Sequence, residues 1–347
     1  MRAAVLYGKE DVRVEEVPVR DLLPGEVRVR IGAALTCGTD VKVYRRGYHA
    51  RMIQPPAVFG HEMAGEIVSL GADVQGWRLG DRVVIANSAP CGTCFYCRRN
   101  HTELCEDLLF LNGAYAEYLN VPARVVQKNM YLLPAHIAYA EAALTEPLAC
   151  VVRGMDEMPV MKDETVVVLG LGPIGLLFVQ MCVLSGARVL AVGRRQERLA
   201  LAAELGAAEV FDVAEMQDDA ELIRPVRART EEGQGVDKVI EAVGQTGAWE
   251  TAIALARKAA TVSLFGGCPS GTSIPLDTHR IHYDELTLKG TFSHTPDTFR
   301  RSLGLIIDGS VPARRFLQQE APLADLPAVL ASLANGTNGA IKTCILP

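Results

Sequence analysis

The spacing of apolar residues changes near residue 163 and divides the chain into two parts. Before this point, short runs alternate or cluster apolar side chains. Turn signals such as Pro24-Gly25 and Gly80-Asp81 separate these runs, which is typical of β-strands. The strands predicted in this part are Arg2–Leu6, Val12–Val17, Val27–Ile31, Ile67–Leu70 and Arg82–Ile85. We therefore expect the first half of the chain to be rich in β-structure.

After this change, continuous apolar strands alternate with helical stretches. The predicted strands are Thr165–Leu169, Arg188–Val192, Glu209–Phe211, Lys238–Glu241, Thr261–Phe265 and Leu286–Lys289. The clearest helices between them are Pro173–Ser185 and Gln196–Leu205, and each is followed by a glycine. This alternation indicates a parallel sheet covered on both faces, and about six such strands fit a doubly wound dinucleotide-binding domain. Two helices, near Pro296–Ile307 and Leu326–Leu333, and a strand near Ile341–Leu346 complete the chain.

Composition and charge narrow the possible functions. The 347 residues, 49% hydrophobic and 22% charged, suit a globular protein of two domains. The net charge of −6 gives no support for a nucleic-acid or membrane-surface partner. The first ten residues lack the pattern of a signal peptide, and glycine and proline interrupt the longest apolar stretch, near Val166–Leu184. We therefore expect a cytoplasmic protein without a membrane partner.

Four of the nine cysteines lie in one short segment with the spacing C-x2-C-x2-C-x7-C. These are Cys91, Cys94, Cys97 and Cys105. Four thiolates at about 2.3 Å complete a tetrahedral shell around zinc and leave no open position, which predicts a structural site. An iron–sulfur cluster is the main alternative, and buried core cysteines or an oxidised framework are others. His101 lies inside the loop, but with four cysteines present we expect it at the surface.

A second set of metal donors is spread along the chain. Cys37 is followed by the pair His61-Glu62 and, much later, by Glu146. A catalytic zinc takes a few such donors and keeps one position open for water or substrate. Each residue alone is weak support, because cysteine and histidine also occur as buried core residues.

A glycine motif follows the strand Thr165–Leu169 and opens the next helix. It has the form G-x-G-x-x-G, and its predicted cofactor-binding residues are Gly170, Gly172, Pro173, Ile174 and Gly175. Glycine permits the tight turn and a close approach of the backbone to a pyrophosphate, and the helix N-terminus offers free N–H groups. The pattern therefore predicts a dinucleotide site rather than a plain turn.

The residues after the second strand favour NADP over NAD. That strand usually ends in an acidic residue that binds the ribose 2′-hydroxyl of NAD, whereas here the tip reads Gly193-Arg194-Arg195. Arginine binds phosphate through its charge and its paired N–H donors. Arg198 is expected to reach the adenosine end. The alternative is an NAD enzyme with two solvated arginines.

In these motifs the chain resembles the zinc-containing medium-chain alcohol and polyol dehydrogenases over nearly its whole length. The resemblance rests on Cys37-Gly38-Thr39-Asp40, Gly60-His61-Glu62, the four cysteines, Glu146-Pro147-Leu148, the glycine motif and Gly339-Ala340-Ile341-Lys342. It implies an α/β fold with a GroES-like, β-rich catalytic domain at 1–148, which carries the structural-zinc lobe at about 90–106. A Rossmann domain at 149–293 and a return to the catalytic domain at 294–347 would follow, with the active site in the cleft between the domains.

The resemblance also implies roles for the metal-site residues. Cys37 and His61 would be the constant ligands of the catalytic zinc, and Glu62 a direct or water-exchanging ligand that also counts among the catalytic residues. Glu146 would be the further ligand, and a glutamate at this position resembles the sorbitol, polyol and threonine dehydrogenase branches. Thr39 would contact the substrate oxygen, and Asp40 would orient His61.

Further roles concern the cofactor and the proton path. Phe292 matches a segment near the nicotinamide, and Lys342 matches a basic residue that approaches the pyrophosphate. In many family members a histidine ends the proton relay at the position that Lys42 occupies here. The residues leave open which group ends the relay in this chain.

The resemblance therefore implies an oxidoreductase with two zinc ions per chain that moves a hydride between a secondary alcohol and NAD(P), with NADP favoured. A polyol, sugar or cyclitol is the favoured substrate, with the corresponding ketone as product, and a homodimer or homotetramer is the expected assembly. A threonine-type amino-alcohol dehydrogenase and a non-catalytic zinc and nucleotide-binding protein are alternatives. A zinc-free quinone or enoyl reductase is disfavoured because such enzymes lack the zinc ligands seen here.

Overall fold

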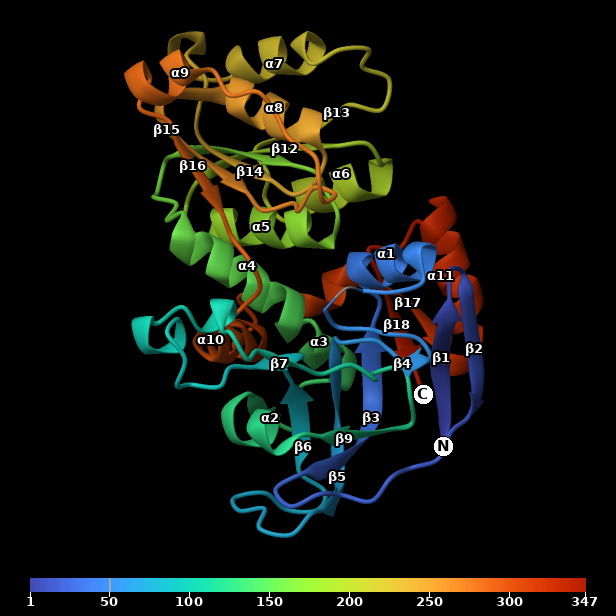
Figure 1. Cartoon of the computed structure of the whole chain (residues 1–347). Helices are drawn as coiled ribbons and strands as arrows, with labels where there is room; N and C mark the ends of the chain where they lie inside the picture. Colours follow the sequence, from blue (N-terminus) through green and yellow to red (C-terminus); the bar gives the residue numbers. More distant parts are fainter. Residues whose placement is uncertain (50) are drawn as a thin grey trace. The chain divides into compact units, whose positions relative to one another are not determined.

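The computed structural model describes residues 1–49 and 51–347 and separates them into two compact units. The first unit consists of Met1–Ala149 together with His294–Pro347, and the second is Cys150–Ser293. The chain thus leaves the first unit once and returns to it (Figure 1). Among the described residues, none of the helices has the length and apolar character needed to cross a membrane.

The first unit contains most of the strands and several short helices. Its strands are β1 (Arg2–Gly8), β2 (Asp11–Glu16), β3 (Val27–Leu35), β4 (Ala57–Val58), β5 (Met63–Leu70), β6 (Arg82–Ile85), β7 (Ser88–Ala89), β8 (Leu109–Phe110), β9 (Tyr118–Val121), β10 (Met130–Leu132), β17 (Leu317–Pro322) and β18 (Lys342–Leu346). Its helices are α1 (Gly38–Arg46), α2 (Ala123–Lys128), α3 (Tyr139–Ala143), α10 (Pro296–Ile307), α11 (Leu326–Asn335) and the short η1 (Cys97–Arg99), η2 (Thr102–Leu104), η4 (Ala313–Phe316) and η5 (Leu323–Asp325). Helix α4 (Thr145–Glu157) begins in this unit and continues into the second.

The main sheet of the first unit has seven strands in the order β10-β6-β5-β3-β18-β17, with β9 also pairing with β3. Strand β3 alternates buried and more exposed positions as a strand with one face on the core does. The C-terminal strand β18 lies antiparallel to the end of β3, with Cys344 opposite Leu35. This pairing brings the last residues of the chain beside the segment that follows β3. Smaller sheets, β2-β1-β4 and β7-β8, complete the unit.

The first half of the chain is β-rich as expected, but it also holds a helix that the apolar pattern did not predict. Helix α1 begins directly after Cys37 and buries only Asp40 and Val43. With so few buried positions, it has no apolar stripe to reveal it in the sequence. Its start is instead set by capping: the Cys37 sulfur accepts from the N–H of Thr39, and the Asp40 carboxylate accepts from the N–H of Cys37.

The second unit is a doubly wound α/β domain. Its strands are β11 (Thr165–Leu169), β12 (Arg188–Gly193), β13 (Glu209–Asp212), β14 (Val236–Glu241), β15 (Ala256–Leu264) and β16 (Thr287–Gly290). Its helices are α5 (Pro173–Leu184), α6 (Gln196–Glu204), α7 (Ala220–Arg227), α8 (Thr246–Leu255), α9 (Thr278–Tyr283) and the short η3 (Glu231–Gly233). In Figure 1, α5 lies on one side of the sheet and α7 and α8 lie on the other.

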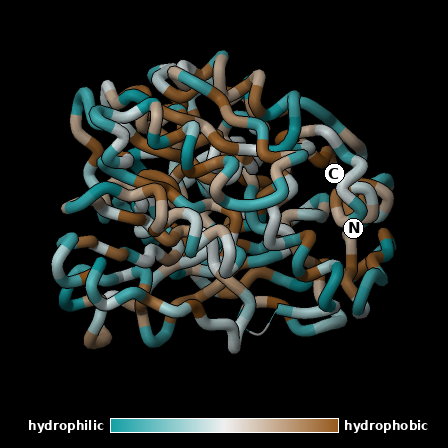
Figure 2. The backbone as a smooth tube through the Cα atoms, turned by 90° about the horizontal axis from the view of Figure 1, so that it is seen from above, coloured by the Kyte–Doolittle hydropathy of each residue, from teal (hydrophilic) through white to brown (hydrophobic). Residues whose placement is uncertain are grey.

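All neighbouring strands of this sheet run parallel, in the order β13-β12-β11-β14-β15-β16. Numbered along the chain, this is the order 3-2-1-4-5-6 of a Rossmann domain, so the predicted α/β fold class is confirmed. The central strands are fully buried at Val167, Leu190 and Val239, which explains their continuous apolar runs. Figure 2 colours the backbone by hydropathy and shows hydrophobic stretches, in brown, interspersed along the chain with hydrophilic stretches, in teal.

Candidate active site

Three donor side chains meet where β3 ends and β5 begins. The donor atoms of Cys37, His61 and Glu62 all lie within 4.8 Å of one another. The antiparallel pairing of Ala34 with Met63 brings the two ends of these strands together. Because Cys37 follows one strand and the His61-Glu62 pair precedes the other, the sheet itself assembles the cluster.

A buried carboxylate holds two of these donors in place. Asp40 is fully buried, and its Oδ2 accepts from the Cys37 N–H at 2.9 Å and from the Tyr115 hydroxyl at 2.6 Å. Its Oδ1 lies 3.3 Å from Nδ1 of His61. With Nδ1 turned toward Asp40, the other ring nitrogen of His61 is left for a metal.

Tyr115 is a site residue that the sequence did not reveal. It is fully buried, and burial together with Asp40 raises the pKa of its hydroxyl well above the usual value. Its ring packs against Gly60, where an added Cβ would meet ring atoms at 2.7 Å and where φ is +94°. Only glycine fits both requirements at this position. An isolated tyrosine carries no signal of such a role in the sequence.

The cluster has the charged groups and the unpaired donor atom expected of a metal site. Among the described residues, Glu62 Oε1 is buried without a hydrogen-bond partner, although buried carboxylate oxygens are normally paired. Burial lowers the pKa of His61, but Asp40 and Cys37 together raise it well above its ordinary value. The site therefore favours positive charge. Thiolate, imidazole and carboxylate are the donors that zinc takes in proteins, so the residues present fit a zinc ion.

Lys342, predicted to approach the cofactor pyrophosphate, lies buried beside Glu62. It is 2% exposed, and its ammonium donates to Glu62 Oε2 and, at 3.0 Å, to the carbonyl of Thr36. The pairing of β18 with β3 places it there. A buried ammonium with these partners balances the charge of Glu62 in the donor cluster, and its approach to the cofactor pyrophosphate stays a prediction.

Glu146 lies beside the three-donor cluster rather than within it. It is in the first turn of α4, is 7% exposed, and its Oε1 accepts from Asn87 at 2.7 Å. Burial raises the pKa of its carboxyl to about 7, against the opposing charges of His61 and Lys342. Asn87 in turn contacts His294. No motif in the sequence marks Asn87 as a site residue.

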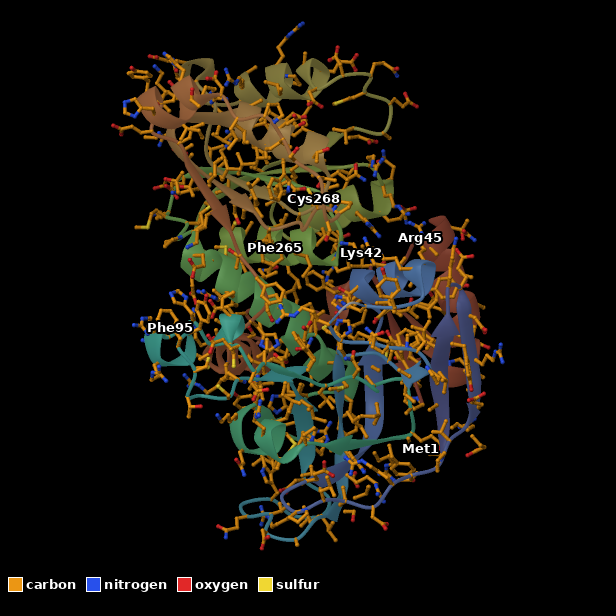
Figure 3. All side chains as sticks on the ribbon, in the orientation of Figure 1. Met1, Lys42, Arg45, Phe95, Phe265 and Cys268 are labelled. Carbon is orange, nitrogen blue, oxygen red and sulfur yellow. The ribbon has the colours of Figure 1, made fainter. Side chains whose placement is uncertain are left out.

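Thr39 and Lys42 lie on α1. Thr39, predicted to contact the substrate oxygen, is half-buried in the first turn of the helix, two residues after the Cys37 donor. Lys42, which takes the place of the family's relay histidine, is exposed (Figure 3).

The four cysteines of the predicted structural-zinc lobe also converge. The sulfur atoms of Cys91, Cys94, Cys97 and Cys105 all lie within 4.8 Å of one another, and all four residues are free thiols. Backbone N–H groups point at the sulfurs, as from Cys94 to Cys91 at 3.3 Å and from Cys91 to Cys105 at 3.2 Å. N–H donation from Thr93 lowers the pKa of Cys91 to about 6, whereas burial raises the pKa of Cys97 to about 12. This lobe fits a closed, four-thiolate metal site.

His101 stands apart from these sulfurs. Its side chain is 53% exposed, and its Nδ1 lies 3.2 Å from Glu103, as expected for a surface residue. Phe95, labelled in Figure 3, is also exposed on this lobe, at 46%. The lobe therefore has few apolar side chains with which to form a core of its own.

In the second unit, a pocket of about 580 Å³ lies at the carboxyl ends of the central strands. Its lining includes six of the predicted cofactor-binding residues: Gly170, Gly172, Gly193, Arg194, Arg195 and Arg198. Pro173, Ile174 and Gly175 form the first turn of α5 beside it. Phe292, also predicted to bind the cofactor, is 50% exposed and is not part of this lining.

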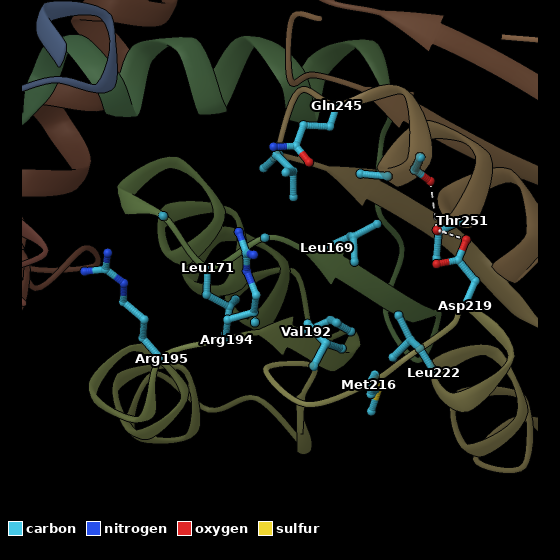
Figure 4. Close-up of a pocket in the computed structure, with 18 of the residues that line it drawn as sticks. Leu169, Leu171, Val192, Arg194, Arg195, Met216, Asp219, Leu222, Gln245 and Thr251 are labelled. Atoms are coloured by element: carbon cyan, nitrogen blue, oxygen red, sulfur yellow. Dashed lines mark hydrogen bonds between the residues drawn. The ribbon is translucent and has the colours of Figure 1, made fainter. Parts of the chain in front are cut away.

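Each of these features suits a dinucleotide. At Gly170 the backbone has φ of +99°, and an added Cβ at Gly175 would meet the Gly170 carbonyl at 1.8 Å, so the turn requires glycine at both positions. Figure 4 shows Arg194 and Arg195 pointing to different sides, with Arg195 extending away from the other labelled residues. Burial and the charge of Arg195 lower the pKa of Arg198, and the lining contains three arginines beside Asp218 and Asp219.

Comparison with known proteins gives consistent matches. The alcohol dehydrogenase GroES-like domain matches residues 23–132, and the zinc-binding dehydrogenase domain matches residues 173–308. The sorbitol dehydrogenase of Bombyx mori is 30% identical over 92% of each chain. The L-threonine 3-dehydrogenase of Pyrococcus abyssi is 33% identical over 90% of this chain and 87% of its own.

A solved structure is similar over the whole chain. It is a candidate zinc-binding dehydrogenase from Sinorhizobium meliloti, bound to NADP. It superposes with a TM-score of 0.90 at 28% identity, covering 100% of this chain and 99% of its own.

Proposed function

Because this chain belongs to the zinc-containing medium-chain dehydrogenases and is an oxidoreductase of their alcohol and polyol type, we propose that it oxidises a secondary alcohol of a polyol, sugar or cyclitol with NADP, or reduces the matching ketone. The observation that carries this proposal is the convergence of Cys37, His61 and Glu62 in one cluster. The same chain also has a dinucleotide-type pocket.

The metal-site residues have distinct roles in the proposed reaction. Cys37, His61, Glu62 and Glu146 would hold the catalytic zinc, which supplies a Lewis acid for the substrate oxygen. Asp40 fixes the direction of His61. The Thr39 hydroxyl would relay the proton that the substrate hydroxyl releases, giving up its own hydrogen as it accepts the new one. A bound nicotinamide would accept the hydride from the carbinol carbon during oxidation, or return it to the carbonyl carbon during reduction. With the four cysteines of the lobe, this makes two zinc ions per chain.

The cationic side of the pocket supports NADP. Arg194, Arg195 and Arg198 all line it, and Arg198 Nε is buried without a hydrogen-bond partner among the described residues. Concentrating like charges is unfavourable unless an anion compensates them. The 2′-phosphate of NADP would provide that anion. A Sinorhizobium meliloti relative with this overall fold is bound to NADP.

Replacing Arg194 and Arg195 together with glutamine should weaken NADP selectively. We expect kcat/KM with NADP to fall about 10- to 100-fold, because a hydrogen bond to a charged group contributes about 1.5–3 kcal/mol. The value with NAD should change about threefold or less. Steady-state kinetics with both cofactors measures this. Arg188→Gln, at the opposite end of β12, is the matched control. Equal losses for both cofactors would refute the phosphate-binding role.

A substrate screen tests the proposed reaction. Zinc-loaded protein is mixed with polyols, sugars, cyclitols and amino alcohols, each with NADP and with NAD, and absorbance at the wavelength of the reduced nicotinamide is followed. We expect reduction of NADP with a polyol, sugar or cyclitol. No cofactor reduction across the panel by protein with both metal sites filled would instead favour a non-catalytic zinc and nucleotide-binding protein.

A threonine-type amino-alcohol dehydrogenase is the second proposal. The 33% identity with the Pyrococcus abyssi threonine dehydrogenase favours it, and Glu146 suits both branches. Lys42 in the place of the relay histidine counts against it. Turnover of threonine alone in the same screen would decide for this alternative.

The cellular context is also a proposal. Metal-binding thiols suit a reducing compartment, so we propose a cytoplasmic location. By resemblance to the family, the assembly is a homodimer or homotetramer.

A further inference from the structure

A buried hydrogen-bond chain runs from His294 through Asn87 to Glu146. Asn87 Nδ2 donates to Glu146 Oε1 at 2.7 Å, and Asn87 Oδ1 lies 2.8 Å from His294 Nε2. The exposed fractions are 3% for His294, 9% for Asn87 and 7% for Glu146. The three residues are far apart in the sequence, so the chain of contacts exists only in the folded unit.

The two ends of the Asn87 side-chain amide play different parts in these hydrogen bonds. Asn87 turns its amide nitrogen, a donor, to Glu146 Oε1, and this leaves its amide oxygen, an acceptor, facing His294 Nε2. The ring of His294 must then carry a hydrogen on Nε2. Burial keeps this ring neutral and lowers its pKa to about 4. The ring is also held by Phe299, whose centroid lies 5.4 Å away. Each member therefore restrains the next.

The sheet places this chain beside the metal donors. Strand β6 pairs antiparallel with β5, with Ile85 opposite Met63. Asn87 follows β6 by two residues and His61 precedes β5 by two residues, so both leave the sheet at the same end. Glu146 then reaches Asn87 from the start of α4. Since Asn87 occupies Oε1, the other carboxylate oxygen of Glu146 is left for a further partner.

We propose that Asn87 and His294 are positioning residues that hold Glu146 so that its Oε2 faces the metal bound by Cys37, His61 and Glu62. This inference rests on the zinc site of the proposed function. The amide fixes one oxygen of the carboxylate, and the histidine fixes the amide. Without Asn87, the buried carboxylate loses its donor and its fixed orientation. Residues that orient metal ligands typically change metal affinity or activity 10- to 100-fold when replaced.

Zinc release from the full-length, zinc-loaded protein tests this role without any substrate. Transfer of zinc to a chromogenic chelator is followed, and a Cys37→Ser protein identifies the phase that belongs to the four-cysteine lobe. We expect Asn87→Leu and His294→Phe each to speed zinc release from the site of Cys37, His61 and Glu62 by about tenfold or more. His294→Gln keeps a donor near the position of Nε2 and should release zinc nearly as slowly as the unaltered protein.

Tyr131→Phe is the matched control. The Tyr131 hydroxyl donates to the Pro296 carbonyl at 2.9 Å, and its ring stacks on Phe299. The substitution therefore removes a hydrogen bond close to His294 without touching Asn87 or Glu146. Its zinc release should match that of the unaltered protein. If it speeds release as much as His294→Phe does, local loosening explains the effect and the proposal is overturned.

The Glu146→Gln background shows whether the effect runs through Glu146. There, adding Asn87→Leu or His294→Phe should change zinc release by less than about twofold. A full tenfold effect in that background, or unchanged release in the single variants, would overturn the proposal. If Asn87→Leu does not fold, His294→Phe and His294→Gln carry the same comparison. Protein that behaves as expected here but oxidises no alcohol would contradict only the proposed function.

Discussion

Replacing Cys37 with serine should abolish hydride transfer while the fold stays intact. Cys37 is one of three converging donors, and a serine hydroxyl is a poor zinc ligand compared with a thiolate. Lewis-acid activation contributes several kcal/mol of transition-state stabilisation. A loss of about 4 kcal/mol corresponds to roughly a 10³-fold fall in kcat/KM. Steady-state kinetics with the best substrate from the screen, together with metal analysis, measures this.

The fold should survive because Cys37 contributes little to the core. It is half-exposed, and the cap of α1 also depends on Asp40, which remains. The melting temperature should therefore change by no more than about 3 °C, and zinc content should fall from about two to about one per chain. Protein that keeps both zinc ions, or more than about a tenth of its activity, would contradict the assignment of Cys37 as a ligand.

Replacing Cys94 with serine should lower the stability of the fold and leave hydride transfer largely intact. Its thiol is one of four sulfurs that meet in the lobe, and the lobe exposes Phe95, Tyr96 and Leu104. Such a segment has little apolar burial, so bound metal supplies much of its folding free energy. A loss of about 3 kcal/mol would lower the melting temperature of the first unit by roughly 6–12 °C. Calorimetry and metal analysis measure the change.

The two cysteine variants act as controls for each other, because the chemical change is identical. Cys94→Ser should lose one zinc ion, and its still-folded fraction should keep a specific activity within about threefold of the unaltered protein. The loss of stability in the lobe should extend to α2, because the Lys128 ammonium on α2 donates to the Cys91 carbonyl at 2.7 Å. If Cys94→Ser melts normally and still holds two zinc ions, the four thiols are not a structural zinc site.

Much of the second unit followed from local patterns. Continuous apolar strands predicted the parallel sheet, and the glycines at 170 and 175 predicted the turn that the structure contains. The start of β15 was missed, since it begins at Ala256 and the sequence pattern indicated Thr261. Arg257 and Lys258 interrupt the apolar run there, and Ala259 has a positive φ of +57°. Irregular backbone of this kind leaves no periodic signal.

The sequence by itself determined the donor types and the short-range motifs, because metal spacing, glycine turns and apolar strands depend on residues close together in the chain. The C-x2-C-x2-C-x7-C segment is such a case, and its four thiols do converge. The pair His61-Glu62 belongs with Cys37 across only a short interval, which the resemblance could identify.

Only the tertiary structure decided how the site is supported. Tyr115 bonds to Asp40 across 75 residues, His294 contacts Asn87 across 207, and Lys342 pairs with Glu62 across 280. These contacts depend on the register of β3 against β5 and β18 and on the pairing of β6 with β5. Strand register is set by the packing of the whole sheet, so no local pattern records which distant side chains it brings together.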